Sequence, residues 1–204
     1  MFIIEGNIGS GKSTLLNNIH EYAKKCEKEI SIIQEPVDNW MDFKNLEEQS
    51  IFELYYTNPK VYAFPFQMHV LNTRYNLLNK NKGYNVLAER SIYTDKYIFT
   101  KSLFENNFLD DISFNIINEW VDTLVHNIHI DGFIYLQVQP DECYKRMQKR
   151  NRIPEKNIKI EYLTDLHNKH DKWLLNEPNC IIINDNTQEE IEKIFDFMNN
   201  ISPW

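Results

Sequence analysis

The feature that most constrains the fold is a glycine-rich loop near the start of the chain. Residues 6–13 are Gly-Asn-Ile-Gly-Ser-Gly-Lys-Ser, and a short apolar run at residues 2–4 precedes them. They match the Gly-x4-Gly-Lys-Ser/Thr phosphate-binding loop, and an amphipathic helical pattern follows, as this motif requires. Glycines let backbone N–H groups converge on a phosphate, and the N-terminus of the next helix adds a positive dipole. The sequence therefore predicts a site for a nucleoside triphosphate.

Two side chains of this loop have predicted roles. Lys12 is placed to reach the β- and γ-phosphates, and the hydroxyl group of Ser13 is placed to hold Mg²⁺. The loop residues that we expect to contact the triphosphate are Gly6, Asn7, Gly9, Ser10, Gly11, Lys12, Ser13 and Thr14.

Length and composition favour one globular domain. The chain has 204 residues, 42% of them apolar, and no Gly/Ser/Pro-rich linker divides it. A chain of this length builds one well-buried core, so we expect a single domain over residues 1–204. The apolar runs are all too short to cross a bilayer, so the sequence predicts a soluble protein without a membrane partner.

Cysteine usage and charge indicate the compartment and the kind of ligand. Cys26, Cys143 and Cys180 are far apart and lack the spacing of a disulfide framework or a zinc site. The sequence opens directly into an apolar run without a basic leader, so we expect a cytoplasmic protein. The net charge of −8 argues against a nucleic-acid partner, because polynucleotides are held by broad basic surfaces. A bound nucleotide is therefore expected to be small.

Strand and helix patterns alternate along the chain. Apolar runs typical of buried strands occur at residues 2–5, 30–34, 84–88, 133–138 and 180–184. Helical periodicity occurs at residues 12–28, 62–80, 109–128, 141–150 and 160–175, and a last helix starts at Thr187. This alternation predicts an α/β fold with a doubly wound parallel five-stranded sheet.

The predicted sheet brings three polar segments to one edge. Ligands of such sheets bind at the carboxyl ends of the strands. The glycine-rich loop follows the first strand, Glu35 follows the second, and Glu89-Arg90 follows the third. We therefore expect one cleft that holds all three. A carboxylate beside a phosphate-binding loop suits transfer of a phosphoryl group to an alcohol, although a solvated loop glutamate and a surface Glu-Arg ion pair would give the same pattern.

A basic segment stands out against the acidic background. Residues 145–152 hold five basic side chains, and Arg146 and Arg150 are four residues apart. On a helix these two arginines share one face, so both could reach the same phosphate. A solvated basic face is the alternative interpretation.

Taken together, these segments resemble the deoxyribonucleoside kinase family, which includes deoxycytidine and deoxyguanosine kinases. The resemblance covers nearly the whole chain, and it lies in the order of the motifs more than in the phosphate-binding loop alone. The matching segments are residues 6–14, Glu35-Pro36-Val37 with Trp40, Tyr56 with Asn58-Pro59, Pro65-Phe66-Gln67, Glu89-Arg90-Ser91 with Tyr93 and Asp95, and Arg146, Arg150 and Arg152 before Glu155.

The resemblance implies an ATP- and Mg²⁺-dependent enzyme with the P-loop kinase architecture. Glu35 matches the general base that accepts the proton of the 5′-hydroxyl group, and Arg90 matches the arginine beside the transferring phosphoryl group. Glu89, with Ser13, matches the pair that holds magnesium. Residues 146–157 match a short arginine-rich lid, in which Arg146, Arg150 and Arg152 close over the triphosphate.

Further positions match the nucleoside pocket of the family. Tyr56 and Glu155 match the residues that hold the sugar 3′-hydroxyl group, Phe66 and Phe99 match the walls around the base, and Trp40 belongs to the same pocket. Gln67 matches the amide that faces the Watson–Crick edge. Buried aromatic side chains are often only core residues, so the tyrosine and the phenylalanines keep that alternative.

The choice of base depends on Arg74 and Asp95. In the family an arginine and an aspartate at these positions accompany cytosine and purine bases, whereas members that prefer thymidine carry apolar residues. A carboxylate held by arginine accepts from an exocyclic amino group but opposes the thymine carbonyl group. An ordinary surface ion pair is the alternative.

The sequence therefore predicts a deoxynucleoside kinase that transfers the γ-phosphate of ATP to deoxycytidine, deoxyadenosine or deoxyguanosine ahead of thymidine, in nucleotide salvage. One alternative is a nucleoside monophosphate kinase of the thymidylate type, which shares the loop and the basic lid. A nucleotide-dependent switch is another. Family members are commonly dimers, so we expect a homodimer, and residues 112–124 could form its interface.

Overall fold

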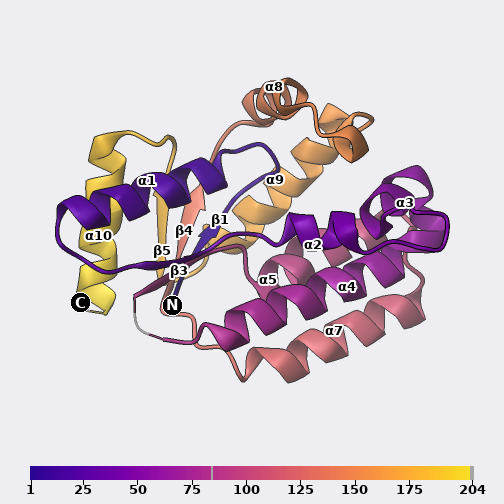
Figure 1. Ribbon diagram of the computed structural model, residues 1–204, viewed down its shortest axis with the longest axis horizontal. Helices are drawn as coiled ribbons and strands as arrows, with labels where there is room; N and C mark the ends of the chain where they lie inside the picture. Colours follow the sequence, from indigo (N-terminus) through magenta and orange to yellow (C-terminus); the bar gives the residue numbers. More distant parts are fainter. Residues whose placement is uncertain (84, 203–204) are drawn as a thin grey trace.

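The computed structural model describes residues 1–83 and 85–202. Its centre is a parallel sheet with the strand order β2-β3-β1-β4-β5, which confirms the predicted doubly wound five-stranded sheet (Figure 1). The strands are β1 (Phe2–Glu5), β2 (Ser31–Ile33), β3 (Val86–Glu89), β4 (Gly132–Leu136) and β5 (Cys180–Ile183). Strand β1 lies at the point where the chain changes direction through the sheet, so the loop after it lies in the crevice where ligands of such folds bind.

Helices and helical turns connect the strands. The first part of the chain holds α1 (Lys12–Lys25), α2 (Val37–Asp42), α3 (Ile51–Thr57), α4 (Pro59–Lys80), α5 (Ile92–Thr94), the π-helical turn η1 (Asp95–Thr100) and α6 (Lys101–Glu105). The second part holds α7 (Asp111–Val125), α8 (Pro140–Arg150), the 3-10 turn η2 (Ile153–Glu155), α9 (Ile160–Leu174) and α10 (Gln188–Ile201).

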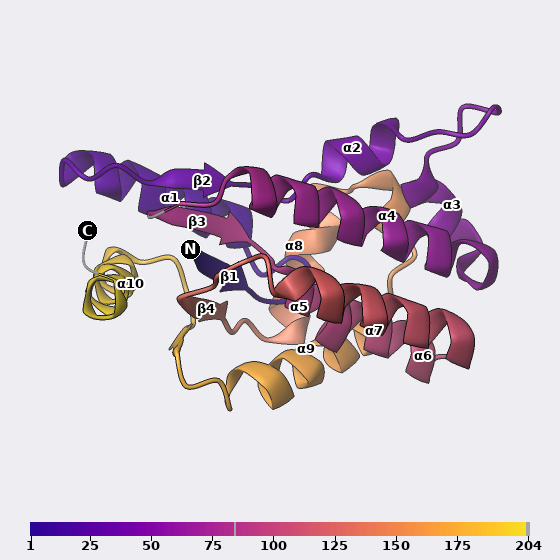
Figure 2. The ribbon, with the colours of Figure 1, turned by 90° about the horizontal axis from the view of Figure 1, so that it is seen from below.

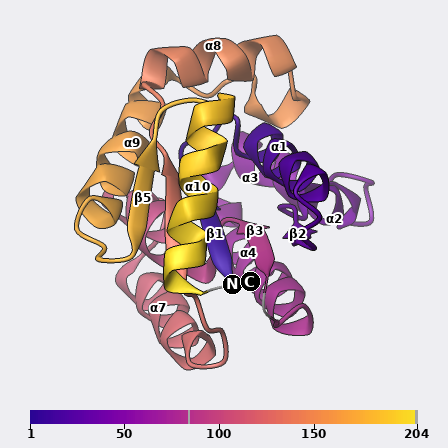
Figure 3. The same ribbon diagram turned by 90° about the vertical axis from the view of Figure 1, so that its left-hand side faces the viewer.

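Two hydrophobic layers cover the sheet. Helices α1 and α10 lie side by side on one face, and α4 and α7 lie beside each other on the opposite side of the molecule (Figures 2 and 3). Side chains of the strands alternate between the two layers, so Ile3 packs toward α4 whereas Ile4 packs toward α1. Burial on both faces explains why these strands are continuous apolar runs in the sequence.

All five predicted strands are present, with ends that differ by a few residues. Tyr84, predicted as the first residue of the third strand, lies outside the described residues. Sequence reasoning missed α2, α3 and the helical run from α5 to α6. None of the described helices is long and apolar enough to cross a membrane.

Candidate active site

The phosphate-binding loop is held in a conformation that needs glycine. Gly9 and Gly11 have φ angles of 78° and 103°, in the left-handed region. A Cβ atom at Gly9 would lie 2.4 Å from the carbonyl oxygen of Cys143, so α8 packs directly on this glycine. Lys12 is 5% exposed, and its Nζ atom donates to the carbonyl oxygen of Asn7 at 2.8 Å. The lysine therefore bends back over the loop, where a phosphate would lie.

Asn7, Ser10 and Thr14 of the loop do not line the cavity. Asn7 is buried and its amide donates to the carbonyl oxygen of Leu163 at 2.8 Å, which ties the loop to α9. Ser10 is fully buried, and its hydroxyl oxygen has no hydrogen-bond partner among residues 1–83 and 85–202. Thr14 is exposed on the first turn of α1. The Asn7 contact therefore supports the loop, whereas contacts of Ser10 and Thr14 with a triphosphate stay predictions.

Ser13 and Glu89 meet at the start of α1. The hydroxyl group of Ser13 donates to Oε2 of Glu89 at 2.8 Å, and Nζ of Lys12 lies 3.9 Å from the other carboxylate oxygen. A hydroxyl and a carboxylate are hard oxygen ligands, as Mg²⁺ prefers, and this ion usually keeps several waters. The described residues include no cluster of three or more acidic, histidine or cysteine side chains around a metal position. The pair therefore fits an ion whose other ligands are phosphate oxygens and water.

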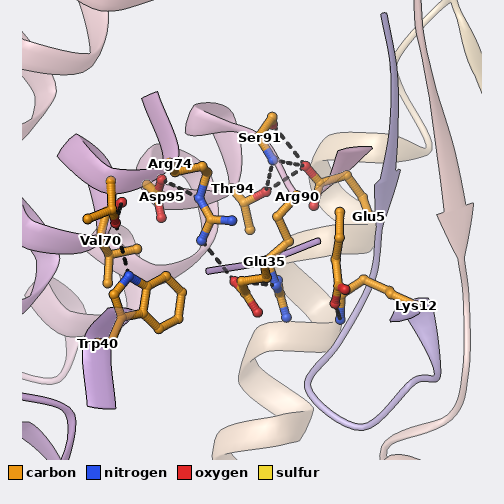
Figure 4. Close-up of polar contacts among 12 residues, drawn as sticks. Glu5, Lys12, Glu35, Trp40, Val70, Arg74, Arg90, Ser91, Thr94 and Asp95 are labelled. Atoms are coloured by element: carbon orange, nitrogen blue, oxygen red, sulfur yellow. Dashed lines mark hydrogen bonds and ion pairs between the residues drawn. The ribbon is translucent and has the colours of Figure 1, made fainter. Parts of the chain in front are cut away.

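Glu35 follows β2 and is held by two arginines. Its Oε1 atom accepts from Nη2 of Arg74 at 2.9 Å and lies 3.3 Å from Nε of Arg90 (Figure 4). Burial acts to raise the pKa of Glu35, but Arg90, Arg74 and Lys12 outweigh it and lower this pKa to about 2. Glu35 is therefore a carboxylate at neutral pH. Such an anion is a weak base, which suits phosphoryl transfer, because the loose transition state depends more on positioning than on base strength.

Arg74 also binds Asp95, and Asp95 binds Gln67. Nε of Arg74 donates to Oδ2 of Asp95 at 2.9 Å, and Nε2 of Gln67 lies 3.4 Å from Oδ1 of the same residue. Asp95 is 0% exposed and does not itself line the cavity, so it acts on the cavity through Gln67 and Arg74. Because Nε2 faces Asp95, the carbonyl oxygen of Gln67 points away from this carboxylate.

Aromatic side chains enclose the space beside Gln67. Phe66 stacks on Tyr55 with ring centroids 4.6 Å apart and meets Trp40 edge to face at 5.9 Å. The guanidinium group of Arg90 lies 4.9 Å from the ring centroid of Phe99. All five residues line the cavity, and three of them, Trp40, Tyr55 and Phe66, also belong to the hydrophobic core.

The basic segment is divided between two partners. Arg146 donates to the carbonyl oxygen of Ser10 at 2.8 Å and pairs with Glu142, whereas Arg150 pairs with Glu155 at 2.6 Å. In this structure the two guanidinium groups therefore have different partners: the loop carbonyl group holds one, and the buried Glu155 carboxylate holds the other. That both arginines reach one phosphate stays a prediction.

Glu155 gathers the end of the basic segment near Tyr56. Its carboxylate is 5% exposed and also pairs with Arg152 at 3.2 Å. Tyr56, Glu155, Arg150 and Arg152 all line the cavity, whereas Arg146 does not. Burial, with nearby Tyr55, raises the pKa of Tyr56 well above its usual value, so its hydroxyl group is available as a donor.

These groups share one cavity, which is the central property of the site. It is lined by Gly9 and Lys12 of the loop, by Glu35, Glu89 and Arg90 at strand ends, and by Gln67 and Arg74 of α4. Sequence reasoning missed Tyr55 and Tyr162, which also line it, and Glu5, which supports it from behind. Glu5 ends an apolar run and precedes a glycine, so no spacing distinguished it.

Comparison with known proteins gives the same assignment as this geometry. The family model described as deoxynucleoside kinase matches residues 2–203. A probable deoxycytidine kinase of Fowlpox virus (strain NVSL) is 41% identical over 177 residues, which cover 84% of this chain and 70% of that protein. Deoxycytidine kinase 2 of Gallus gallus is 31% identical over 195 residues, covering 84% and 72%. Mitochondrial deoxyguanosine kinase of Xenopus laevis is 29% identical over 220 residues, covering 97% and 77%.

The chain therefore belongs to the deoxynucleoside kinase family. Its function is that of a deoxynucleoside kinase, an ATP-dependent phosphotransferase, and the predicted class of enzyme is confirmed. The alternatives of a monophosphate kinase and of a nucleotide switch are not favoured.

Proposed function

We propose that this kinase phosphorylates the 5′-hydroxyl group of deoxycytidine, deoxyadenosine or deoxyguanosine in preference to thymidine. The observation that carries this proposal is the chain of contacts from Gln67 through Asp95 and Arg74 to Glu35. Asp95 accepts from one of the two N–H groups of the Gln67 amide and so fixes which way the amide turns. The amide oxygen, which points away from Asp95, is then placed to accept from a base amino group.

In the proposed mechanism the residues of the cavity divide the work of transfer. Glu35 accepts the proton of the 5′-hydroxyl group, and Arg90 neutralises charge on the oxygen and the phosphoryl group between them. The loop and Lys12 hold the triphosphate. Arg150 and Arg152 break their ion pairs with Glu155 and close over the triphosphate. Tyr56 and Glu155 then hold the sugar 3′-hydroxyl group. Ser13 and Glu89 would hold Mg²⁺, which supplies charge neutralisation on the phosphates when bound.

The proposed lid is residues 146–157, and it belongs to one kinase domain that spans residues 1–204. Arg146 steadies the loop through the Ser10 carbonyl group, while α8 ends at Arg150 and is followed by Asn151, whose φ is 53°. We place the hinge at this left-handed residue.

The proposal also includes a homodimer in the cytoplasm. Helix α7 leaves Ile112, Ile116 and Trp120 exposed by 72%, 37% and 49%. They recur every four residues and so form one stripe, which a second copy of α7 would bury. The cytoplasmic location rests on three free cysteines and on the short apolar runs.

The test measures products directly. Purified protein is incubated with labelled ATP, Mg²⁺ and each of the four deoxynucleosides in turn, with thymidine 5′-monophosphate as a fifth acceptor. A Lys12→Met variant is the control for contaminating kinases, because it lacks the phosphate-binding lysine. The expected result is monophosphate from deoxycytidine or a purine deoxynucleoside ahead of thymidine. Diphosphate made from the monophosphate acceptor alone, or thymidine as the best substrate, would contradict the proposal.

A further inference from the structure

Glu5, the last residue of β1, is a buried carboxylate outside the cavity. It is 0% exposed, and one oxygen, Oε1, accepts three hydrogen bonds from the segment after β3 (Figure 4). The donors are the backbone N–H of Ser91 at 3.1 Å, the hydroxyl group of Ser91 at 2.9 Å and the hydroxyl group of Thr94 at 2.5 Å. A single carboxylate oxygen therefore anchors the segment that carries Glu89 and Arg90.

The anchored segment has a backbone conformation that few side chains adopt. Arg90 has a φ angle of 65°, in the left-handed region, and its N–H donates to the carbonyl oxygen of Ile4 at 3.0 Å. A non-glycine residue there persists only when its surroundings fix it, and such residues cluster at active sites. The fixing groups on either side of Arg90 are the Ile4 carbonyl group and the Glu5 carboxylate.

The charges of Glu5 and Arg90 also depend on each other. Burial raises the pKa of Glu5, and Arg90 is the strongest of the charges that oppose this effect. Arg90 is 2% exposed, and its Nε and Nη1 atoms have no hydrogen-bond partner within the described part of the chain. Its guanidinium group is therefore held by packing on Phe99, by the ion pair with Glu35 and by its own backbone. Small movements of that backbone displace the charge.

We propose that Glu5 is a positioning residue for phosphoryl transfer, which fixes the left-handed turn at Arg90 and thereby holds the guanidinium group beside Glu35. This inference rests on the proposed role of Arg90 in the transfer step. It assigns no substrate contact to Glu5, because Glu5 lies outside the cavity.

The chain offers matched variants for a test. Glu5→Gln keeps a carbonyl oxygen for the three donors but removes the charge that strengthens these bonds. Thr94→Val removes one donor at nearly constant volume, and Thr94→Ser retains it. Thr100→Val is the control, because Thr100 is also fully buried and its hydroxyl oxygen has no hydrogen-bond partner in the described residues.

The assay compares turnover with binding, using a deoxynucleoside that the wild-type protein phosphorylates. We expect Glu5→Gln to lower kcat about tenfold or more, and Thr94→Val to lower it less, while KM and the dissociation constant of the deoxynucleoside change by less than about threefold. Thr94→Ser and Thr100→Val should retain the wild-type kcat. Thermal unfolding of each variant identifies any that fail to fold.

A double-variant cycle separates positioning from general destabilisation. If Glu5 acts through Arg90, Glu5→Gln lowers kcat in the wild-type background but causes no further loss in an Arg90→Ala background. An equal loss in both backgrounds, unchanged kcat in folded Glu5→Gln, or a loss confined to KM would overturn the inference. Absence of deoxynucleoside phosphorylation by the wild-type protein would instead overturn the proposed function.

Discussion

The Arg74–Asp95 pair allows a quantitative prediction of stability. Arg74 is 2% exposed and Asp95 is 0% exposed, and they meet at 2.9 Å. Removing one member of a buried pair leaves an uncompensated charge and costs about 3–5 kcal/mol. Arg74→Met removes the ion-pair partner of the buried Asp95, whereas Asp95→Ala leaves Arg74 paired with Glu35. We therefore expect Arg74→Met to be the less stable single variant, and the double variant to be more stable than Arg74→Met alone.

The same variants test the choice of base. Without Asp95 the amide of Gln67 is free to turn and donate to a thymine carbonyl group, and without Arg74 the neighbouring space becomes apolar. An unpaired buried polar group costs several kcal/mol, so we expect the ratio of kcat/KM for thymidine over deoxycytidine to rise by about 10²-fold in the double variant.

The measurements are urea unfolding of the four proteins and kcat/KM for each deoxynucleoside. Gln67→Ala is the matched control, because it removes the amide but leaves the ion pair in place. An unchanged ranking of substrates in a folded double variant would refute the role in base choice. Strictly additive losses of stability would refute the buried pairing.

Three further predictions concern Glu35 and α7. Glu35→Gln should lower kcat by about 10²-fold or more with nearly unchanged deoxynucleoside binding by calorimetry, and near-wild-type turnover would exclude the proton-acceptor role. Because the pKa of Glu35 falls from an ordinary 4.5 to about 2 on folding, its ionised form contributes about 3 kcal/mol above pH 4.5. This stability is lost as the pH falls toward 2. Between pH 5 and pH 3 the free energy of unfolding, measured with urea, should therefore fall more for the wild type than for Glu35→Gln, and an equal fall in both proteins would contradict this prediction. Trp120→Glu should produce monomers in sedimentation velocity, while Lys145→Glu on α8 should not, and a wild-type monomer would refute the dimer.

The sequence predicted the sheet because its strands are buried on both faces. Runs such as residues 2–5 and 133–138 are apolar at every position or nearly so, and the phosphate-binding loop fixes which strand comes first. The short helices α2 and α3 were missed because six or seven residues span too few turns to show periodicity.

Contacts between distant side chains explain most of what the sequence left open. Gln67 and Arg74 are seven residues, or about two helical turns, apart on α4, and both line the cavity. The bond between Arg74 and Glu35 joins residues 39 positions apart, and only the folded chain reveals it. Helical spacing likewise put Arg146 and Arg150 on one face, but tertiary partners separate their guanidinium groups.

The fork formed by Arg74 has a consequence for how such an enzyme diverges. One guanidinium group touches both Asp95, which contacts the amide proposed to read the base, and Glu35, the carboxylate proposed to accept the proton. A substitution of Arg74 that broadens the range of accepted bases therefore also disturbs the position of Glu35. Substrate range and turnover rate are therefore coupled through Arg74. An enzyme lineage that broadens its substrate range at this position needs a second substitution elsewhere to restore its turnover rate.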